Sequence, residues 1–180
     1  MRKIIEYTLI SVDGVFSNPA GDGFMGYRDD AYLRDGLGQL TQCDSMIMGR
    51  VFYDGASRMW PDRTEHPWAA RLNEMKKYVV SSTLTNPTWN NTEVLHGDPL
   101  EQVRQLKREP GRDLVIWGHT RLAETLMRNR LIDVLDVSIH PVIVGRGQTL
   151  WREGLNVDLQ LVSTKGFQKI VKLTYEPCYQ

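Results

Sequence analysis

The chain contains 180 residues, and its 22 Lys and Arg residues balance its 22 Asp and Glu residues to a formal net charge of zero. A nucleic-acid-binding protein usually carries a basic surplus that displaces counterions, and a polybasic membrane surface needs one too. The charge balance therefore argues against both kinds of partner. Hydrophobic residues make up 41% of the chain, which is ordinary for a globular protein, and the length fits one domain over residues 1–180.

Membrane insertion and secretion are also disfavoured. No apolar run approaches the ~18–20 residues that a membrane helix needs. Residues Met1 to Tyr7 begin like a signal peptide, but Glu6 and Asp13 interrupt the hydrophobic segment and no small-residue cleavage site follows. Cys43 and Cys178 are far apart and favour buried free thiols in a reducing cytosol over a disulfide. The four histidines lack the spacing of zinc ligands, so we expect a cytoplasmic protein without a metal.

The first half of the chain alternates short apolar runs with polar loops and one helical pattern. Leu33, Leu37 and Leu40 recur at helical spacing, although Gly36 and Gly38 weaken the helix. The strands expected in this half are Ile4 to Ile10, Ser45 to Met48 and Lys77 to Ser81. Irregular loops are expected over residues 11–27 and 55–67.

The second half gives stronger signals. Asp98, Pro99 and Glu101 suit an N-cap, a first helical position and an N3 position, so a helix is expected to begin there. Leu114 to Trp117 is apolar throughout, which is typical of a central parallel strand, and a helix follows Gly118. The remaining expected elements are a strand over 134–144 and an antiparallel hairpin of 157–162 and 168–175 joined near Gly166. This order predicts an α/β fold: a mostly parallel sheet flanked by helices, with an antiparallel C-terminal hairpin.

Three strand ends carry residues suited to a phosphate-bearing ligand. In open α/β sheets such ligands bind at the carboxyl ends of the strands, where helix N-termini present free N–H groups. Gly49 lets the backbone approach a ligand, and Arg50 can hold a phosphate bidentately. Ser81-Ser82-Thr83 offers three hydroxyls, and Trp117-Gly118-His119-Thr120 enters a helix whose dipole attracts an anion. Taken singly, each feature also fits an ordinary strand end, a solvated helix residue or a loop.

Two glycine-rich segments are interpreted differently. Gly21 to Gly26 matches the spacing G-x-G-x-x-G, but it begins well after the first strand and Asp22 would face an anionic ligand. A dinucleotide fingerprint joins strand directly to helix, so we interpret this segment as a loop. Gly145-Arg146-Gly147 is interpreted as a turn after a strand, with anion binding by Arg146 as the alternative.

Six segments now form an ordered set. They are Ile10 to Val15, Met48 to Tyr53, Tyr78 to Leu84, Ile116 to Gly118, Leu131 to Asp133 and His140 to Gly147. The set resembles the dihydrofolate reductase-like superfamily, most closely the C-terminal reductase domain of the bifunctional riboflavin-biosynthesis deaminase-reductase. The resemblance covers nearly the whole chain and rests on the order rather than on any single motif. The 180 residues hold no deaminase domain, so we do not expect the bifunctional enzyme.

The resemblance implies a homodimeric enzyme that uses NADPH to reduce a heterocyclic or ribosylamino-pyrimidine-like substrate by hydride transfer. The implied cofactor contacts are Ile10, Gly14, Gly49, Arg50, Ser81, Ser82, Thr83, Trp117, Gly118, His119, Thr120 and Leu122. The family commonly has Gly-Gly where this chain has Gly118-His119. A side chain at position 119 would either crowd the pyrophosphate or add a cationic donor to it.

A proton source and substrate contacts complete the predicted site. Hydride transfer needs positioning and a proton donor, and a carboxyl group in an apolar pocket has a raised pKa that suits this role. The candidates are Asp13, which we favour, and Asp29 and Asp30; a helix cap or a solvated turn is the alternative for each. Candidate substrate contacts are Ser11, beside the nicotinamide, and an aromatic wall of Tyr27, Trp60 and Trp68 that fits core packing equally well.

Two classes of function follow. The first is an NADPH-dependent oxidoreductase acting on a small molecule. The alternative is a non-catalytic nucleotide- or ligand-binding regulatory domain on the same fold, which Gly118-His119 and the lack of a clear proton donor favour. A different α/β enzyme, such as a flavin-dependent one, is a third possibility, and a yellow purified protein would indicate it.

Overall fold

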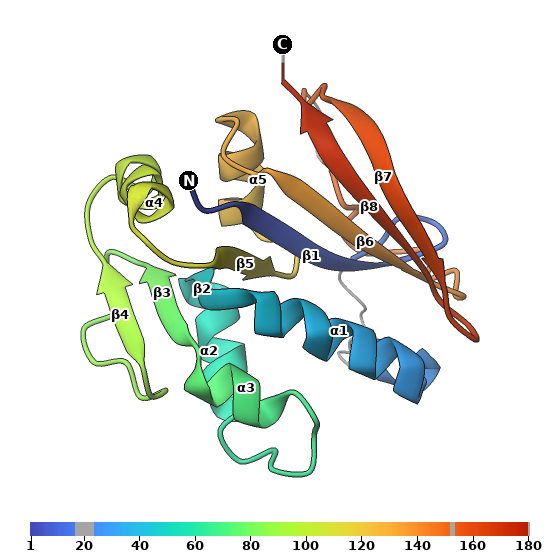
Figure 1. Ribbon diagram of the computed structural model, residues 1–180, viewed down its shortest axis with the longest axis horizontal. Coiled ribbons are helices and arrows are strands. Elements are labelled where there is room, and N and C mark those ends of the chain that lie inside the picture. Colours follow the sequence, from blue (N-terminus) through green and yellow to red (C-terminus); the bar gives the residue numbers. More distant parts are fainter. Residues whose placement is uncertain (17–23, 152–153, 180) are drawn as a thin grey trace.

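The computed structural model describes residues 1–16, 24–151 and 154–179. Its strands are β1 (Ile4–Ser11), β2 (Cys43–Gly49), β3 (Lys76–Val80), β4 (Thr92–Leu95), β5 (Asp113–Trp117), β6 (Val134–His140), β7 (Asp158–Gly166) and β8 (Val171–Cys178). They form one eight-stranded sheet in the order β4-β3-β2-β5-β1-β6-β8-β7 (Figure 1). Strands β1 to β6 pair in parallel, whereas β8 is antiparallel to both β6 and β7. The predicted α/β fold with an antiparallel C-terminal hairpin is confirmed.

Short side chains with a hydrogen-bonding oxygen begin three of the helices. Asp29 caps α1 (Asp30–Gln42) by accepting from the Tyr32 backbone N–H at 2.8 Å. Asp98 caps α4 (Pro99–Arg108), as predicted, and Thr120 caps α5 (Arg121–Arg128). The other helical segments are η1 (Met25–Tyr27), α2 (Arg50–Met59) and α3 (Ala69–Glu74).

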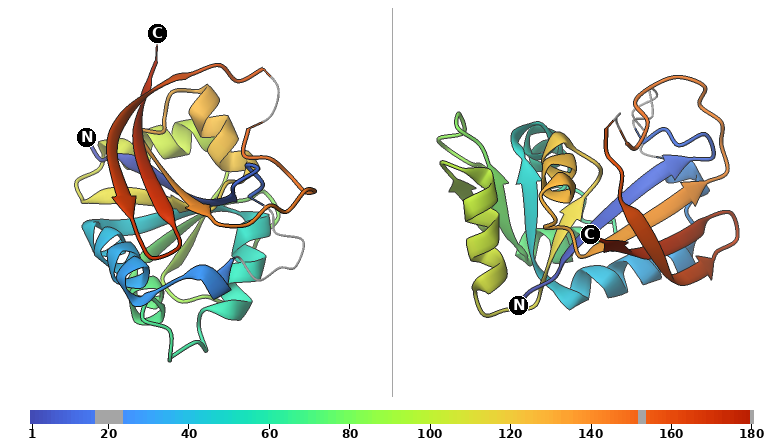
Figure 2. Two further views of the ribbon diagram at one scale, coloured as in Figure 1. Left: turned by 90° about the vertical axis from the view of Figure 1, so that its right-hand side faces the viewer. Right: turned by 90° about the horizontal axis from the view of Figure 1, so that it is seen from above.

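The helices cover both faces of the parallel part of the sheet (Figures 1 and 2). On one face, α1, α2 and α3 contribute Leu40, Tyr53 and Leu72 to a core rich in aromatic residues. On the other face, α4 and α5 contribute Leu106 and Leu126 to a mainly aliphatic core. The site described below lies at the edge of the sheet where α2 and α5 begin.

A glycine inside α1 is explained by its neighbour across the core. A Cβ atom on Gly36 would lie 2.5 Å from Cζ2 of Trp68. The Trp68 side chain is 1% exposed, and its indole N–H donates to the carbonyl of Leu33 at 2.7 Å. Gly36 therefore gives the helix the flat surface against which this indole packs.

Several boundaries differ from the predictions. The strand expected over 134–144 ends at His140, because Pro141 has no N–H with which to continue the ladder. The short elements α3 and β4 were not predicted, since six and four residues are too few to show a clear periodicity. Both cysteines are free, but only Cys43 is buried, whereas Cys178, the last residue of β8, is exposed.

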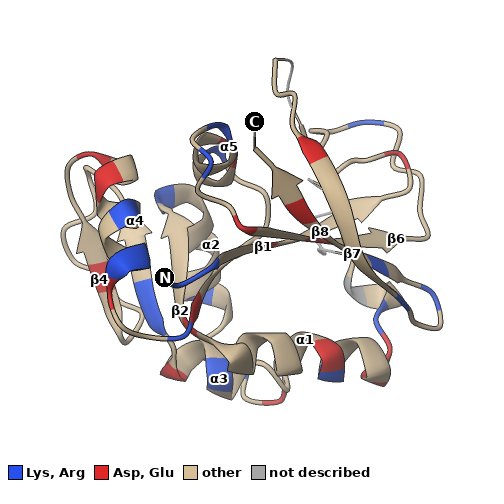
Figure 3. Ribbon diagram, turned by 45° about the horizontal axis from the view of Figure 1, so that its top comes forward, with Lys and Arg blue, Asp and Glu red and all other residues tan. Residues whose placement is uncertain are grey.

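Acidic and basic residues are interspersed along the helices and strands rather than collected on one element (Figure 3). Among the described residues, no helix is both long enough and apolar enough to cross a membrane. Residues 21–23 of the glycine-rich segment lie outside the described residues, so its interpretation as a loop stays a prediction.

Candidate functional site

The carboxyl ends of β2 and β5 bring two helix N-termini together. These strands are parallel neighbours in the sheet, so the chain leaves both at the same edge. Gly49 ends β2 and is the N-cap of α2, while Thr120 is the N-cap of α5. The first N–H groups of a helix have no partner within the helix, so two sets of free donors lie at this edge.

Two glycines keep the backbone open between these helix starts. A Cβ atom on Gly49 would lie 3.9 Å from Cβ of Leu122, and one on Gly118 would lie 3.3 Å from Cε2 of Phe52. Gly118 also has φ +77°, a conformation that other residues rarely adopt. The two loops thus form a cradle that side chains at these two positions would fill.

Arg50 stands at the first position of α2 but is already paired. Its Nε donates to both carboxylate oxygens of Asp54, at 2.7 and 2.8 Å, and both side chains are 40% exposed. An incoming phosphate would share the guanidinium with Asp54. The predicted role of Arg50 therefore remains available, but Asp54 competes with it.

The three hydroxyls after β3 divide into two roles. Ser81 Oγ accepts from the backbone N–H groups of Thr83 and Leu84, at 3.1 and 3.0 Å, and so stabilises the turn. Ser82 and Thr83 are exposed at the edge of the sheet. These two side chains are presented to solvent more fully than Ser81, which is partly exposed.

The side chain of His119 is turned into the protein. Its Nδ1 lies 2.6 Å from Oε1 of Glu6, a fully buried residue of β1. The imidazole packs edge-on against Phe16 and Trp151, with ring centroids 5.2 and 4.7 Å away. This corrects the expectation that the side chain would crowd or bind the pyrophosphate: at position 119 only the backbone is offered to a ligand.

Asp13 does not have the environment of a proton donor. It accepts hydrogen bonds from Ser11 Oγ at 2.5 Å and from the backbone N–H groups of Val144 and Gly145 at 3.1 and 2.7 Å. These donors, the Ser11 hydroxyl foremost, lower the pKa of Asp13 to about 2. Ser11 is itself fully buried, with Oγ also accepting from the Val15 N–H. Both expected roles are corrected, since these residues tie the loop after β1 to the loop after β6.

Replacing Asp13 with Asn should therefore reduce stability rather than remove a chemical step. Because the pKa is lowered on folding, the ionised carboxylate stabilises the native state above pH 3.8, and this contribution is lost as the pH falls toward about 2. The difference in unfolding free energy between wild type and D13N should thus be largest near neutrality and should shrink in acid. Denaturant unfolding at several pH values measures it. Unchanged stability with lost activity would return Asp13 to a catalytic role.

Trp60 and Trp68, which were predicted to form part of an aromatic wall, pack in a buried cluster with Trp117. Trp117, the last residue of β5, stacks on Trp60 with centroids 5.4 Å apart and lies 5.2 Å from Trp68. All three indoles are at most 9% exposed. Tyr27 belongs to a different group, edge-on to His140 at 6.2 Å. The sequence prediction named Trp60 and Trp68 but missed that Trp117 joins them.

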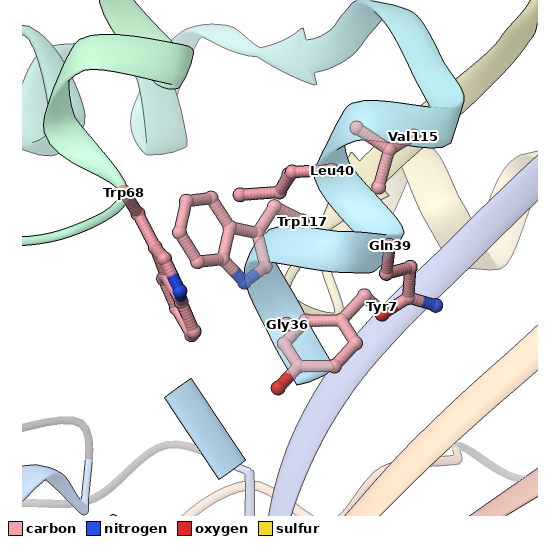
Figure 4. A pocket seen from close by; sticks show the side chains of 7 residues that line it. All are labelled: Tyr7, Gly36, Gln39, Leu40, Trp68, Val115 and Trp117. Atoms are coloured by element: carbon pink, nitrogen blue, oxygen red, sulfur yellow. The ribbon is translucent and has the colours of Figure 1, made fainter. Parts of the chain in front are cut away.

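A small cavity lies between this cluster, α1 and the sheet (Figure 4). Its lining residues are Tyr7, Gly36, Gln39, Leu40, Trp68, Val115 and Trp117, and its volume of about 10 Å³ is roughly what one water molecule needs. The Tyr7 hydroxyl is hydrogen-bonded to that of Tyr32 on α1. Burial raises the pKa of both tyrosines, so both hydroxyls stay protonated at neutral pH. No sequence motif marks this pair, because 25 residues separate its members.

The remaining predicted contacts surround the cradle or the loop after β1. Leu122 and Trp117 are buried beside the cradle, whereas Ile10 is partly exposed near the end of β1. Gly14 has φ +80°, and a Cβ atom there would meet nothing within 4 Å. The structure thus places Gly49, Gly118 and the start of α5 together. The loop that contains Asp13 is instead hydrogen-bonded to the loop after β6, the strand on the other side of β1.

Comparison with known proteins gives a single assignment. The model of the RibD C-terminal domain matches residues 2–173. The uncharacterized protein YyaP of Bacillus subtilis (strain 168) is 29% identical in an alignment of 192 positions, gaps included, that covers 97% of this chain and 94% of YyaP. These matches agree with the resemblance drawn from the ordered motifs.

Solved structures show the same fold. A protein from Shewanella sp. PV-4, named for riboflavin biosynthesis, has a TM-score of 0.80 at 18% identity, covering 99% of this chain and 100% of its own. Dihydrofolate reductase from Enterococcus faecalis, complexed with NADP(H), has a TM-score of 0.66 at 15% identity, covering 97% of this chain and 96% of its own. At these identities the likeness concerns the fold.

Proposed function

Since the chain belongs to the family of RibD C-terminal domains, we propose that it is an NADPH-dependent reductase that transfers hydride to a small heterocyclic or ribosylamino-pyrimidine-like substrate. The observation that carries the proposal is the cradle, in which Gly49 and Gly118 leave the starts of α2 and α5 open to a diphosphate. The enterococcal reductase, which has this fold, is complexed with NADP(H) and gives further support.

The residues that would hold the cofactor are those with accessible groups at the three strand ends. They are the backbone at Gly49, Gly118, His119 and Thr120, the guanidinium of Arg50, and the hydroxyls of Ser82 and Thr83. When bound, NADPH would supply the hydride, and the protein's part is to position it and to exclude water. Tyr7 and Tyr32 take the place of Asp13 as groups that hold a proton, because their hydroxyls are bonded to each other and Tyr7 lines the cavity.

A non-catalytic ligand-binding domain is the second candidate function. The environment of Asp13 favours it, because a pKa lowered to about 2 leaves this carboxyl group without the proton that a donor needs. NADPH binding without turnover of pteridines, flavin precursors or quinones would support this alternative. The homodimer implied by the resemblance and the cytoplasmic location expected from the two cysteines stay predictions.

Titration with NADPH, followed by nicotinamide fluorescence, tests the proposed cofactor. Saturable binding at submillimolar concentrations is expected, and its absence would overturn the proposal. Arg50→Ala should weaken NADPH binding about tenfold while changing NADH binding less, because a charge-assisted hydrogen bond to the 2′-phosphate would be lost. Asp54→Asn should have the opposite effect, since it removes the carboxylate that competes for Arg50.

Arg58→Ala serves as the matched control, because this exposed arginine lies in the last turn of the same helix. It should leave both cofactor affinities unchanged. If Arg50→Ala weakens NADPH and NADH equally, Arg50 does not contact the 2′-phosphate.

A further inference from the structure

Glu6 places a carboxyl group inside β1, the strand that lies between β5 and β6 in the sheet. Its side chain is fully buried, and a buried carboxyl group is costly unless it is paired. Oε1 lies 2.6 Å from Nδ1 of His119, whereas Oε2 has no hydrogen-bond partner among residues 1–16, 24–151 and 154–179. The bond to His119 forms whichever of the two groups carries the shared proton.

Two consecutive residues of β1 hold two consecutive residues of the loop between β5 and α5. The carbonyl of Tyr7 accepts from the backbone N–H of Gly118 at 2.8 Å, and the side chain of Glu6 bonds to that of His119. The imidazole is 4% exposed and packs against the rings of Phe16 and Trp151. One backbone bond and one side-chain bond thus fix the loop to the centre of the sheet just before α5 begins.

The N–H groups that follow these two anchors are left for a ligand. Thr120 Oγ1 accepts from the Ala123 N–H at 3.3 Å, and the Thr120 carbonyl accepts from the Glu124 N–H at 3.0 Å. The N–H groups of residues 119–122, by contrast, have no acceptor in the part of the chain that the structure describes. The direction in which these four groups point depends on the loop backbone that Gly118 and His119 anchor.

We propose that Glu6 and His119 are positioning residues for the cradle: their buried hydrogen bond holds the start of α5 so that the N–H groups of residues 119–122 face the diphosphate of the cofactor. Neither side chain is exposed enough to contact the ligand. Replacing both members of a buried polar pair by apolar groups is often neutral for stability, so we assign this bond to the geometry of the site. The diphosphate rests on the proposed function, whereas the anchoring of the loop does not.

Hydrogen exchange of the ligand-free protein tests the anchoring. The Gly118 N–H donates to Tyr7 and the Leu114 N–H donates to Lys3, both at 2.8 Å and at opposite ends of β5. Glu6→Leu should speed exchange at Gly118 about tenfold and leave Leu114 unchanged, because the loss of the hydrogen bond loosens the loop locally. Global destabilisation would speed exchange at both amides. An equal response of the two amides would overturn the proposal.

Two further variants separate the hydrogen bond from stability. Glu6→Gln keeps both an acceptor and a donor for the His119 ring, so it should retain the Gly118 protection and the wild-type Kd for NADPH. The double variant Glu6→Leu with His119→Leu should regain the stability that Glu6→Leu loses, while its Kd for NADPH stays about tenfold raised. Recovery of the Kd together with stability would show that the pair serves core packing alone and would contradict the proposal.

Thr8→Val is the matched control. Thr8 lies two residues after Glu6, on the same face of β1, and is 1% exposed. Its hydroxyl has no hydrogen-bond partner among the described residues, so its removal breaks no anchor of the loop. This variant should leave both the Gly118 exchange rate and the Kd for NADPH unchanged. Effects equal to those of Glu6→Leu would indicate a general response to changes in β1 and would refute the specific role of the pair.

NADPH titration of the wild type separates this inference from the proposed function. If the wild type does not bind NADPH while Glu6→Leu still speeds exchange at Gly118 alone, the reductase proposal fails and the anchoring of the loop stands. If the wild type binds NADPH and Glu6→Leu changes neither its Kd nor the Gly118 exchange rate, the role of the pair alone is wrong.

Discussion

Replacing Gly36 with alanine is expected to destabilise the protein by about 1–3 kcal/mol, the usual cost of overpacking a core. The new methyl group would lie 2.5 Å from Cζ2 of Trp68. That indole has little freedom to retreat, because it is held by its hydrogen bond to Leu33 and by its contact with Trp117. Helix propensity acts in the opposite direction, since alanine is better than glycine by about 1 kcal/mol. The steric effect should be the larger of the two.

Gly38→Ala is the matched control for this prediction. It lies in the same helix, and its added Cβ would meet nothing within 4 Å. Propensity alone then predicts a gain of up to about 1 kcal/mol. Urea unfolding of both variants measures the contrast, and an equal gain for both would show that Trp68 does not press on Gly36. Trp68→Phe in the Gly36→Ala background should recover part of the loss, because a smaller ring leaves room for the methyl group.

Gly118→Ala is expected to abolish most of the affinity for NADPH. A residue with a Cβ atom pays about 1–2 kcal/mol to adopt a left-handed conformation, and Gly118 has φ +77°. The added methyl group would also approach Phe52 to 3.3 Å and occupy the cradle between α2 and α5. We expect at least a tenfold increase in the Kd for NADPH, together with a moderate loss of stability.

The two effects of this substitution are separated by Gly154→Ala. Gly154 has φ +80° and open space around its Cβ position, and its carbonyl accepts from Arg128 at the far end of α5. It should therefore lose stability through the same backbone strain while keeping the Kd of the wild type. If Gly154→Ala weakens NADPH binding as strongly as Gly118→Ala does, strain rather than occupation of the cradle explains the result.

Local chemistry made much of the fold predictable. The cap at Asp98 and the apolar run Leu114 to Trp117 are decided by neighbouring residues, and both were predicted correctly. The positions of Gly49 and Gly118 followed from the rule that parallel strands end at a common edge. These features need only the order of the elements, which the sequence pattern displays.

The failures concern side chains that depend on distant partners. His119 is turned inward by Glu6, which is 113 residues away, and Asp13 accepts hydrogen bonds from backbone N–H groups that are 131 and 132 residues away. The periodicity of a single chain carries no information about such pairs.

The central position of β1 has a consequence for synthesis on the ribosome. Its Ile4 pairs with Leu114 of β5, and its Ile5 pairs with Val134 of β6. The first strand to be made must therefore wait, without sheet partners, until more than half of the chain has been translated. Pairings of such long sequence separation slow folding and leave an apolar strand open to aggregation. The nascent chain should accordingly remain sensitive to chaperones and proteases until β6 emerges.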